Sequence, residues 1–403
     1  MTEKMKPSGI AWIGEIPTGW DVKRVKYVIQ NNADGIKVGP FGSALTNEVV
    51  SSEEGQYKIY GQANLIRKDF NYGDNFVTEE NYRRLINYEV LPDDIAVSMM
   101  GTIGKCSVVP YGIQPGIMDS HLIKIRLSKK MSPRFFEYIY ESCVVYEQLV
   151  VNSKGSIMNG LNSTIVKSVF LAVPSIDEQT VIADFLDAQC AKIDSVIADI
   201  EKQIETLQKY KKSLIIETIT NRKANWKYGR IKDLMTLQRG HDLPQEEFVS
   251  GNVPVYGSNG VIGYHNIPTT AGPCVTIGRS GSVGALNYVN CDFWAHNTAI
   301  FIANSKGNHI RYLYYVLQSF DIKELANGSA VPTLDRKKVE GIHLYFTLDP
   351  IEQREIANYL DARITKFNQI IDVKQLQLDT IRQHKKSLIY EYVTGKKRVT
   401  EVN

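Results

Sequence analysis

Glu178-Gln179 … Ile182-Ala183 … Leu186-Asp187-Ala188 … Lys211-Lys212-Ser213-Leu214-Ile215 is the stretch that decides the fold, because it occurs twice. Adding 174 to each number gives Glu352-Gln353 … Ile356-Ala357 … Leu360-Asp361-Ala362 … Lys385-Lys386-Ser387-Leu388-Ile389. Over residues 178–223 and 352–397, 19 of the 46 aligned positions are identical without a gap. The period is about half of the chain, which is too long for a solenoid. It indicates two copies of one unit, and so two similar surfaces related by a rotation.

Both copies carry an apolar stripe in alternating steps of four and three residues, which is typical of a coiled coil. A helix of about 44 residues is about 65 Å long, and neither copy contains a glycine or proline hinge before Gly395. We predict an antiparallel pair, because only that arrangement gives the duplication a two-fold axis; two long helices that each pack on their own domain are the alternative. Lys211 and Lys385 also fall on the stripes, where we expect the seam to open or the lysine stems to extend outward. The predicted helix-pairing residues are Leu186, Ile193, Ile197, Ile200, Ile204, Leu207 and Leu214 of the first helix and Leu360, Ile364, Phe367, Ile371, Leu378, Ile381 and Leu388 of the second.

The segments outside the helices are rich in short β-type runs separated by glycine turns. We predict strands at 94–98, 121–127, 274–277 and 298–302, and one short aromatic helix in each segment, at 133–140 and 310–317. These segments are also duplicated, but they are less alike than the two helices are. We therefore expect the two helices to bind one kind of partner and the two domains to recognise different targets. The matching pieces are Trp20-Asp21-Val22-Lys23-Arg24-Val25-Lys26 with Trp226-Lys227-Tyr228-Gly229-Arg230-Ile231-Lys232, Tyr60-Gly61 with Tyr256-Gly257, Gly101-Thr102-Ile103-Gly104 with Gly281-Ser282-Val283-Gly284, and Gly155-Ser156 … Leu161 with Gly328-Ser329 … Leu334.

The composition is that of an ordinary globular protein: 403 residues, 43% hydrophobic, 23% charged and a net charge of +3, which is weak evidence for a nucleic-acid partner. Five cysteines without C-x-x-C spacing argue against zinc or a disulfide framework and fit a reducing cytoplasm. The N-terminus lacks a signal-type apolar core, and no stretch approaches 18 apolar residues. We therefore expect a cytoplasmic protein with no membrane association.

The sequence shows no catalytic centre of its own. An adenine-methylating enzyme needs an Asn/Asp-Pro-Pro-aromatic motif, which does not occur. The turn before Lys105 is not a phosphate-binding loop, because Met99 and Cys106 stand where that loop needs Gly and Ser or Thr. Asp93 and Asp94 have no counterpart in the second half, so we interpret them as a solvated turn. The seven histidines show no metal-ligand spacing, and we predict no cofactor and no metal.

Taken together, the repeated motifs resemble the specificity subunits of type I restriction–modification enzymes over essentially the whole chain. The resemblance rests on the Trp-x-x-x-x-(Val/Ile)-Lys start of each half, the Gly-(Thr/Ser)-(Ile/Val)-Gly turn, the Gly-Ser … Leu stretch, and the Glu-Gln and Lys-Lys-Ser-Leu-Ile ends of the helices. It implies two target recognition domains that each read half of a split sequence in double-stranded DNA. It also implies partner methyltransferase subunits, generally two copies, which bind the methyl donor, and a restriction and motor subunit.

We therefore predict an α+β chain with two similar α/β target recognition domains, residues 1–175 and 223–349. Two long antiparallel coiled-coil spacer helices, 176–222 and 350–403, separate them in a pseudo-two-fold internal duplication. The predicted function is a non-catalytic, sequence-specific DNA-binding subunit that directs partner enzymes. A coiled-coil scaffold that carries two protein-binding domains is the alternative, and the missing motifs argue against a self-contained methyltransferase or nuclease.

DNA contacts need Lys, Arg, hydroxyl or amide groups in loops, so the candidates are polar residues beside glycine turns. Arg279 is the most specific candidate, because the flanking glycines of Gly278-Arg279-Ser280-Gly281 let the backbone approach a phosphate while an arginine reaches a guanine. For His121 and His296, which lead into strands, hydrogen bonding inside the domain is an equal alternative. The candidates are Lys37, Ser43, Gln62, Asn64, Arg67, Lys68, Thr102, Lys105, His121, Lys154, Ser156 and Asn159 in the first domain, and Arg239, His241, Ser258, Asn259, Tyr264, His265, Arg279, Ser280, Ser282, His296, Asn297, Ser329 and Thr333 in the second.

Overall fold

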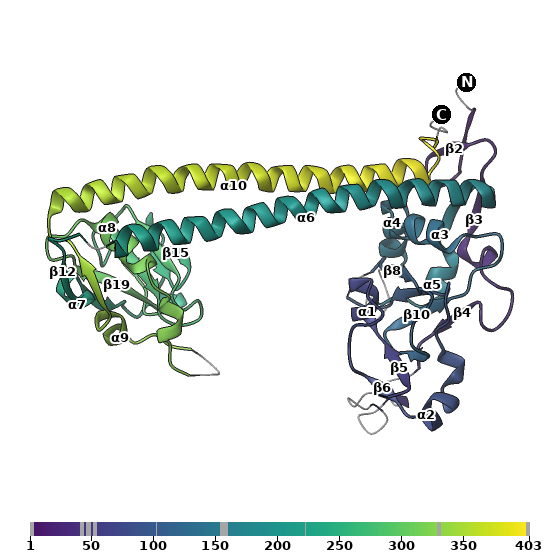
Figure 1. Cartoon of the computed structure of the whole chain (residues 1–403), viewed down its shortest axis with the longest axis horizontal. Coiled ribbons are helices and arrows are strands. Elements are labelled where there is room, and N and C mark those ends of the chain that lie inside the picture. The colour runs from purple at the N-terminus through teal and green to yellow at the C-terminus, as the bar shows by residue number, and fades with distance from the viewer. Residues whose placement is uncertain are drawn as a thin grey trace. The chain divides into compact units, whose positions relative to one another are not determined.

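The computed structural model describes residues 4–40, 44–45, 50, 55–101, 103–153, 160–221, 223–328 and 332–399. The chain divides into two compact units: unit 1 comprises residues 1–198 and 378–403, and unit 2 comprises residues 199–377. Each unit contains one globular domain and a part of both long helices, α6 (Ile176–Thr220) and α10 (Pro350–Val393) (Figure 1). The predicted boundaries between globular domains and helices stay predictions.

The two long helices begin and continue for ordinary local reasons. Pro350 is the first residue of α10, where its missing N–H costs nothing, and Asp349 accepts a hydrogen bond from the backbone of Ile351 at 2.9 Å. The Ser175 hydroxyl accepts one from the backbone of Glu178 at 3.3 Å at the start of α6. Because no glycine or proline interrupts either helix beyond its first turn, both run for about twelve turns.

Burial along the helices follows the apolar stripes. From Cys190 to Leu214 in α6, and from Ile364 to Leu388 in α10, every stripe residue is buried or half-buried and every residue between is exposed. This pattern is that of a two-helix seam. Leu186 and Leu360, at the starts of the stripes, are fully buried in the cores of the globular domains instead.

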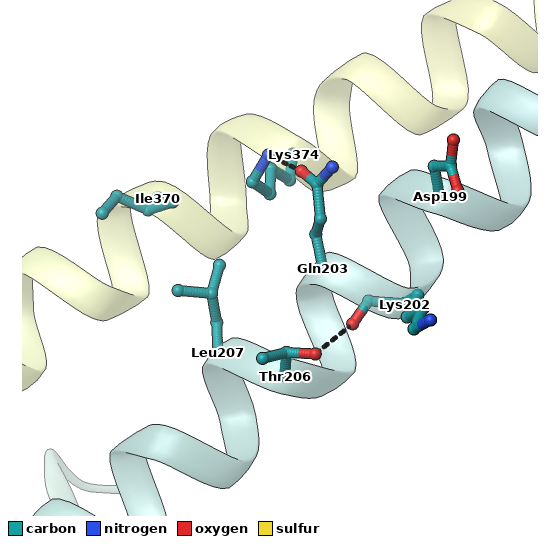
Figure 2. Close-up of a pocket in the computed structure, with 7 residues that line it drawn as sticks. All are labelled: Asp199, Lys202, Gln203, Thr206, Leu207, Ile370 and Lys374. Atoms are coloured by element: carbon teal, nitrogen blue, oxygen red, sulfur yellow. Dashed lines mark hydrogen bonds between the residues drawn. The ribbon is translucent and has the colours of Figure 1, made fainter.

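Polar pairs across the seam show that the helices are antiparallel. In unit 2 the Nζ atom of Lys374 donates to Gln203, and that of Lys211 donates to Asn368 Oδ1 at 2.8 Å, so the partner's number falls as the α6 number rises. A cavity of about 420 Å³ opens beside the first pair, and Figure 2 shows Leu207 and Ile370 on its two walls.

The stripe lysines are bound within the helix pair. In unit 1, Lys385 Nζ lies 2.6 Å from Asp194 Oδ1, and in unit 2 Lys211 binds Asn368 as described above. The structure thus adds acceptors on the opposite helix to the expectation that the seam opens or the lysine stems extend outward at these two residues. Each ammonium group finds an acceptor on the opposite helix, which satisfies the charge at the edge of an otherwise apolar seam.

The first globular domain is built from small sheets, and its described residues form three hydrophobic clusters. Its four-stranded sheet has the order β4-β10-β7-β8, its three-stranded sheet β6-β5-β9, and β11 pairs with β3; an N-terminal hairpin joins β1 to β2. The strands predicted at 94–98 and 121–127 and the aromatic helix at 133–140 are confirmed as β7, β10 and α3. The strands are β1 (Met5–Pro7), β2 (Glu15–Pro17), β3 (Asp21–Arg24), β4 (Ile36–Val38), β5 (Tyr57–Tyr60), β6 (Phe76–Val77), β7 (Ile95–Ser98), β8 (Cys106–Val108), β9 (Gly116–Met118), β10 (Leu122–Ile125) and β11 (Phe170–Val173), and the helices are α1 (Gln62–Arg67), α2 (Glu79–Arg84), α3 (Pro133–Glu141), α4 (Cys143–Ser153) and α5 (Ser163–Ser168), with single 3₁₀ turns η1 (Val25–Tyr27) and η3 (Ile86–Tyr88).

The second globular domain repeats three of these four sheets. Its sheets have the orders β13-β19-β16-β17, β15-β14-β18 and β12-β20. In both domains the three-stranded sheet combines one antiparallel and one parallel pair, the parallel pairs being β5 with β9 and β14 with β18. The strands are β12 (Lys227–Arg230), β13 (Thr236–Arg239), β14 (Val253–Gly257), β15 (Gly260–His265), β16 (Cys274–Gly278), β17 (Leu286–Val289), β18 (Trp294–Ala295), β19 (Ala299–Asn304) and β20 (His343–Phe346), and the helices are α7 (Ile231–Leu234), α8 (Ile310–Gln318) and α9 (Arg336–Glu340), with 3₁₀ turns η4 (Gln245–Glu247) and η5 (Ile322–Leu325).

The repeated Glu-Gln motif attaches each globular domain to a long helix. Gln179 and Gln353 are fully buried. Gln179 Oε1 accepts a hydrogen bond from the backbone of Ser132 before α3, and Gln353 Oε1 from that of His309 before α8, both at 2.8 Å. Each amide also donates to a carbonyl of the loop that leads into its long helix. One buried side chain thus joins three segments of the chain in each unit.

The repeated tryptophans bind the neighbouring glutamates. The indole of Trp20 donates to Glu178 Oε2 and that of Trp226 to Glu352 Oε1, both at 3.1 Å. Lys223, just after the end of α6, also donates to Glu352 Oε1 at 2.6 Å. Burial alone raises the pKa of the Glu352 carboxyl, but hydrogen bonding, led by Lys223, outweighs it and lowers that pKa to about 2.

A lowered carboxyl pKa makes the stability of unit 2 depend on pH. Glu352 stabilises the folded state fully above its ordinary pKa of 4.5, and this contribution is lost as the pH falls toward about 2. We expect the urea midpoint of unit 2 to decrease between about pH 5 and 2, and Glu352→Gln to flatten that dependence. Urea unfolding followed by circular dichroism at several pH values measures it. Glu355→Gln, an exposed position on the same helix, is the control; equal slopes in both variants would contradict the assignment.

Candidate nucleic-acid interface

In the first globular domain, four backbone hydrogen bonds tie together the loops at one end of the central strands. We call their residues the first frame. The bonds, from N–H to carbonyl, are Gly39 to Leu122 (2.8 Å), Asp119 to Tyr60 (2.8 Å), Met99 to His121 (2.9 Å) and Leu161 to Met99 (2.9 Å). They bring together loops that are up to 122 residues apart in the sequence.

The second globular domain makes the same four bonds, and we call their residues the second frame. They are Gly240 to Ala299 (2.9 Å), His296 to Tyr256 (3.0 Å), Arg279 to Thr298 (2.8 Å) and Leu334 to Arg279 (2.8 Å). Each loop of one frame thus has a counterpart in the other, in the same chain order. The frames are therefore two copies of one backbone arrangement.

The loosely repeated motifs of the sequence lie in these frames. Met99 and Arg279 are equivalent, and each stands two residues before the first glycine of the Gly-(Thr/Ser)-(Ile/Val)-Gly turn. Those glycines, Gly101 and Gly281, have φ of 73° and 78°, a region that favours glycine. The histidines His121 and His296 are not equivalent, because His296 matches Asp119.

One glycine in each frame permits a close approach of two backbones. A Cβ atom on Gly39 would lie 1.8 Å from the carbonyl oxygen of Asp119, and one on Gly240 would lie 2.1 Å from that of His296. Real Cβ atoms do not come so close to backbone atoms, so each frame needs glycine at this place.

Three arginines line a cavity of about 280 Å³ at the second frame, together with Asn327 and Thr333. Arg239 is held by Asp242 at 3.2 Å, and Arg336 donates to the carbonyl of Leu237 at 2.8 Å. Within the part of the chain that the structure describes, no hydrogen bond or ion pair of the Arg279 guanidinium is found. The cavity, which Asp335 also lines, therefore combines an excess of positive charge with the unused donors of Arg279.

Other predicted residues of the second domain line further cavities. Asn259 and Ser282 line one of about 520 Å³, and His296 lines one of about 540 Å³ whose other walls include Leu243, Phe248 and Ile262. Ser258 lies with Asn259 in the turn between β14 and β15. His241 forms an isolated bridge with His296, and Ser280 forms one with Thr333.

Asp242 is the carboxylate that pairs with Arg239, one of the arginines of this cavity. Asn297 donates a hydrogen bond to it, and this bond, aided by the nearby charges of Arg239, His296 and Arg279, holds the pKa of Asp242 below its ordinary value. The ionised carboxylate orients Asn297 and Arg239 at the surface, where amide and guanidinium donors can contact a polyanion.

Two predicted residues of the second domain occupy other places. His265 is buried, with its ring 4.8 Å from that of Trp294, and its Nδ1 accepts a hydrogen bond from the backbone of Ile267 at 3.1 Å. Its side chain is therefore part of the scaffold. Tyr264 is exposed on β15.

In the first domain, three predicted residues belong to the frame or adjoin it. The Gln62 amide donates to Ser98 Oγ at 2.7 Å and to the Met100 carbonyl at 2.6 Å, which joins α1 to the loop after β7. The His121 ring lies 3.3 Å from Asp119, whose carboxyl pKa is raised by burial. Lys37 lies in β4, two residues before Gly39 in the chain.

Four other predicted residues of the first domain make contacts within it. Asn64 is buried and its amide donates to the carbonyls of Asp69 and Tyr72 at 3.1 and 2.7 Å. Arg67 lies over the ring of Tyr72, 4.1 Å from its centre. Lys68 and Lys105 form ion pairs with acidic residues of α3 and its C-terminal end, Lys105 at 3.6 Å from Glu141. The structure does not bring these four side chains into the first frame.

Some predicted contact residues lie outside the described residues, so their roles stay predictions. They are Ser43, Thr102, Lys154, Ser156, Asn159 and Ser329.

The structure also adds residues that the sequence reasoning missed. Arg336 and Asn327 line the arginine cavity, and Met99 takes the place in the first frame that Arg279 takes in the second. The alignment of the two glycine turns pairs Met99 with Arg279 when it is extended by two residues toward the N-terminus. Arg336 follows the repeated Gly-Ser … Leu stretch by two residues, which was the available signal.

Among the described residues, no cluster of three or more His, Cys, Asp or Glu side chains could hold a metal ion. In the same residues, none of the helices is both long and apolar enough for a membrane span.

Comparison with known families places both halves of the chain in one group. The model of the family described as "Type I restriction modification DNA specificity domain" matches residues 41–206 and again residues 223–379. The two matches cover most of the chain and coincide with its two repeats.

The curated relatives include proteins that align with nearly the whole chain and others that align with less than half of it. The type I restriction enzyme MjaIX specificity subunit of Methanocaldococcus jannaschii is 22% identical over 97% of this chain and 96% of that protein. The EcoprrI specificity subunit of Escherichia coli is 24% identical over 41% of this chain and 43% of that protein.

Solved structures share the fold. A chain from a study of complex assembly and conformational transition of the type I R-M system aligns with a TM-score of 0.72 at 13% identity, covering 95% of this chain and 99% of that one. The HsdS subunit of Thermoanaerobacter tengcongensis aligns with a TM-score of 0.51 at 13% identity, covering 95% and 98%. With two matches to the family model and full-length relatives, the chain belongs to the type I restriction–modification DNA specificity family, and it carries two copies of the family's domain.

Proposed function

We propose that this chain is the DNA-recognition subunit of a type I restriction–modification complex and that each frame reads one half of a split double-stranded target. The observation that supports this most directly is the pair of frames: one backbone arrangement occurs twice and carries different side chains. Phosphate contacts give affinity but no sequence information, whereas side chains at base edges give specificity. Two copies of one backbone arrangement that carry different side chains are suited to the recognition of two half-sites with different sequences.

The chemistry of methylation and cleavage is proposed to lie in partner subunits. Two copies of a methyltransferase subunit would bind the methyl donor and modify adenines, and restriction subunits would supply the motor and the nuclease. The exposed faces of α6 and α10 are the repeated surfaces on which two identical partners could bind. A complex of this kind acts on cellular DNA, so we propose that it works in the cytoplasm. Family membership disfavours the alternative of a scaffold with two protein-binding domains.

The target should be bipartite and non-palindromic. The two frames carry different residues at equivalent positions: Met99 corresponds to Arg279, and Asp119 corresponds to His296. The two half-sites should therefore differ in sequence. The test is to coexpress the chain with a methyltransferase subunit that copurifies with it and to map every methylated adenine in the host DNA. A continuous or symmetric target would rule the proposal out, and the isolated chain should transfer no methyl group.

The first frame should be required for methylation. Gly39→Ala places a methyl group against the Asp119 carbonyl and must open the frame, whereas the nearest atoms to a Cβ on Gly160 are at 3.6 Å, an ordinary contact. We expect Gly39→Ala to lower methylation by about 10-fold or more while partner binding persists, since a single base contact contributes about that much. Gly160→Ala should retain methylation, and copurification monitors assembly. Equal methylation by both variants would contradict a role for the frame.

The long helices should set the number of base pairs between the half-sites. Four residues inserted after Glu205 in α6 and four after Asp372 in α10 fall between the Gln203–Lys374 and Lys211–Asn368 pairs, so both pairs can still form. The insertion adds about 6 Å to each helix, which corresponds to one or two base pairs at about 3.4 Å each. Mapped methylation should show unchanged half-sites and a longer spacer. If the spacer keeps its length, the helices only bind the partners.

A further inference from the structure

Arg279 stands at a position where the two frames agree in backbone and differ in side chain. Its N–H donates to the Thr298 carbonyl, and its carbonyl accepts from the N–H of Leu334, both at 2.8 Å. Met99 makes the two equivalent bonds in the first frame at 2.9 Å. The main chain is thus fixed on both sides of this residue in each domain, whatever side chain it carries.

The Arg279 guanidinium is not tied down by a direct contact within the described part of the domain, although its charge acts on the nearby Asp242. No hydrogen bond or ion pair of its guanidinium is found there, although it lines the cavity with Arg239 and Arg336, which are both held by neighbours. Other frame side chains are used internally: Asp119 and His296 accept hydrogen bonds from the backbone two residues on, at 2.8 and 3.3 Å.

An arginine with a fixed backbone and a full set of unused donors is suited to bidentate recognition. Guanine presents O6 and N7 side by side in the major groove, and this pair of acceptors matches two guanidinium N–H groups. A phosphate contact would be needed equally for every DNA sequence. The first frame would then require a cation at the same place, but it carries the uncharged Met99.

We infer that position 279 determines specificity and that Arg279 recognises a guanine in the half-site read by the second domain. This inference rests on the proposed function, since it assigns one base of the target that the complex methylates. In the first frame the equivalent Met99 packs against the hydrophobic core of its domain, so the other half-site is read without this arginine.

The experiment maps methylated adenines in host DNA for complexes of the full chain with its copurifying methyltransferase subunit. Four chains are compared: wild type, Arg279→Met, Arg279→Lys and Arg239→Ala. In Arg279→Met, which copies the first frame, discrimination at one guanine of one half-site should fall by about 10- to 100-fold, with the rest of the target unchanged. Arg279→Lys keeps the charge but loses the planar guanidinium group that can form two parallel hydrogen bonds. It should therefore also reduce the discrimination in favour of the same guanine. Arg239→Ala should weaken methylation at all sites without changing the target.

Three outcomes would overturn the assignment: an unchanged target in Arg279→Met, a uniform loss of methylation like that of Arg239→Ala, or loss of all methylation from an assembled complex. Should Arg279→Met fail to assemble, Arg279→Lys gives the same comparison with the charge retained. A wild-type complex that methylates no defined sequence would refute the proposed function instead, so the two failures can be told apart.

Discussion

The buried glutamines at the starts of the long helices are the constraint on which the rest of each unit depends. Gln179 and Gln353 have no exposed surface, and each satisfies the backbone N–H before a short aromatic helix and a carbonyl before its own long helix. A buried amide that lost these partners would leave several polar groups unsatisfied, at about 1–3 kcal/mol each. Beside the glutamines, Glu178 accepts a hydrogen bond from the indole of Trp20, and Glu352 accepts one from that of Trp226. In each unit these bonds hold the globular domain and the start of its long helix together.

The helix pair uses its polar groups in a similar way. A seam of leucine and isoleucine alone would tolerate sliding by a heptad. Lys385 on Asp194, and Lys211 on Asn368, are charged or polar pairs whose partners lie on the opposite helix, and each is lost if the register slips. The apolar stripe therefore supplies association, and the lysines select one antiparallel register within each unit.

The two frames show how one fold can carry two specificities. The backbone hydrogen bonds and the close contacts of Gly39 and Gly240 are the same in both domains, because they involve only main-chain atoms and the absence of a side chain. The side chains of Met99 and Arg279 take no part in these backbone bonds, so the two residues can differ while the backbone arrangement stays the same. Recognition can thus diverge while the scaffold and the helix surfaces stay alike.

The sequence by itself determined the duplication, the two long helices, their stripes, several strands and the family. These features depend on local periodicity or on direct repetition, which are visible without coordinates. Only the tertiary structure decided which loop residues meet. Asn64 and His265 look like any other polar residue beside a turn, yet they are buried, whereas Arg336 and Met99 lie at the frames. The reason is that each frame joins loops from distant parts of the chain through main-chain hydrogen bonds, and such bonds leave no pattern in side-chain identity beyond the glycines that permit them.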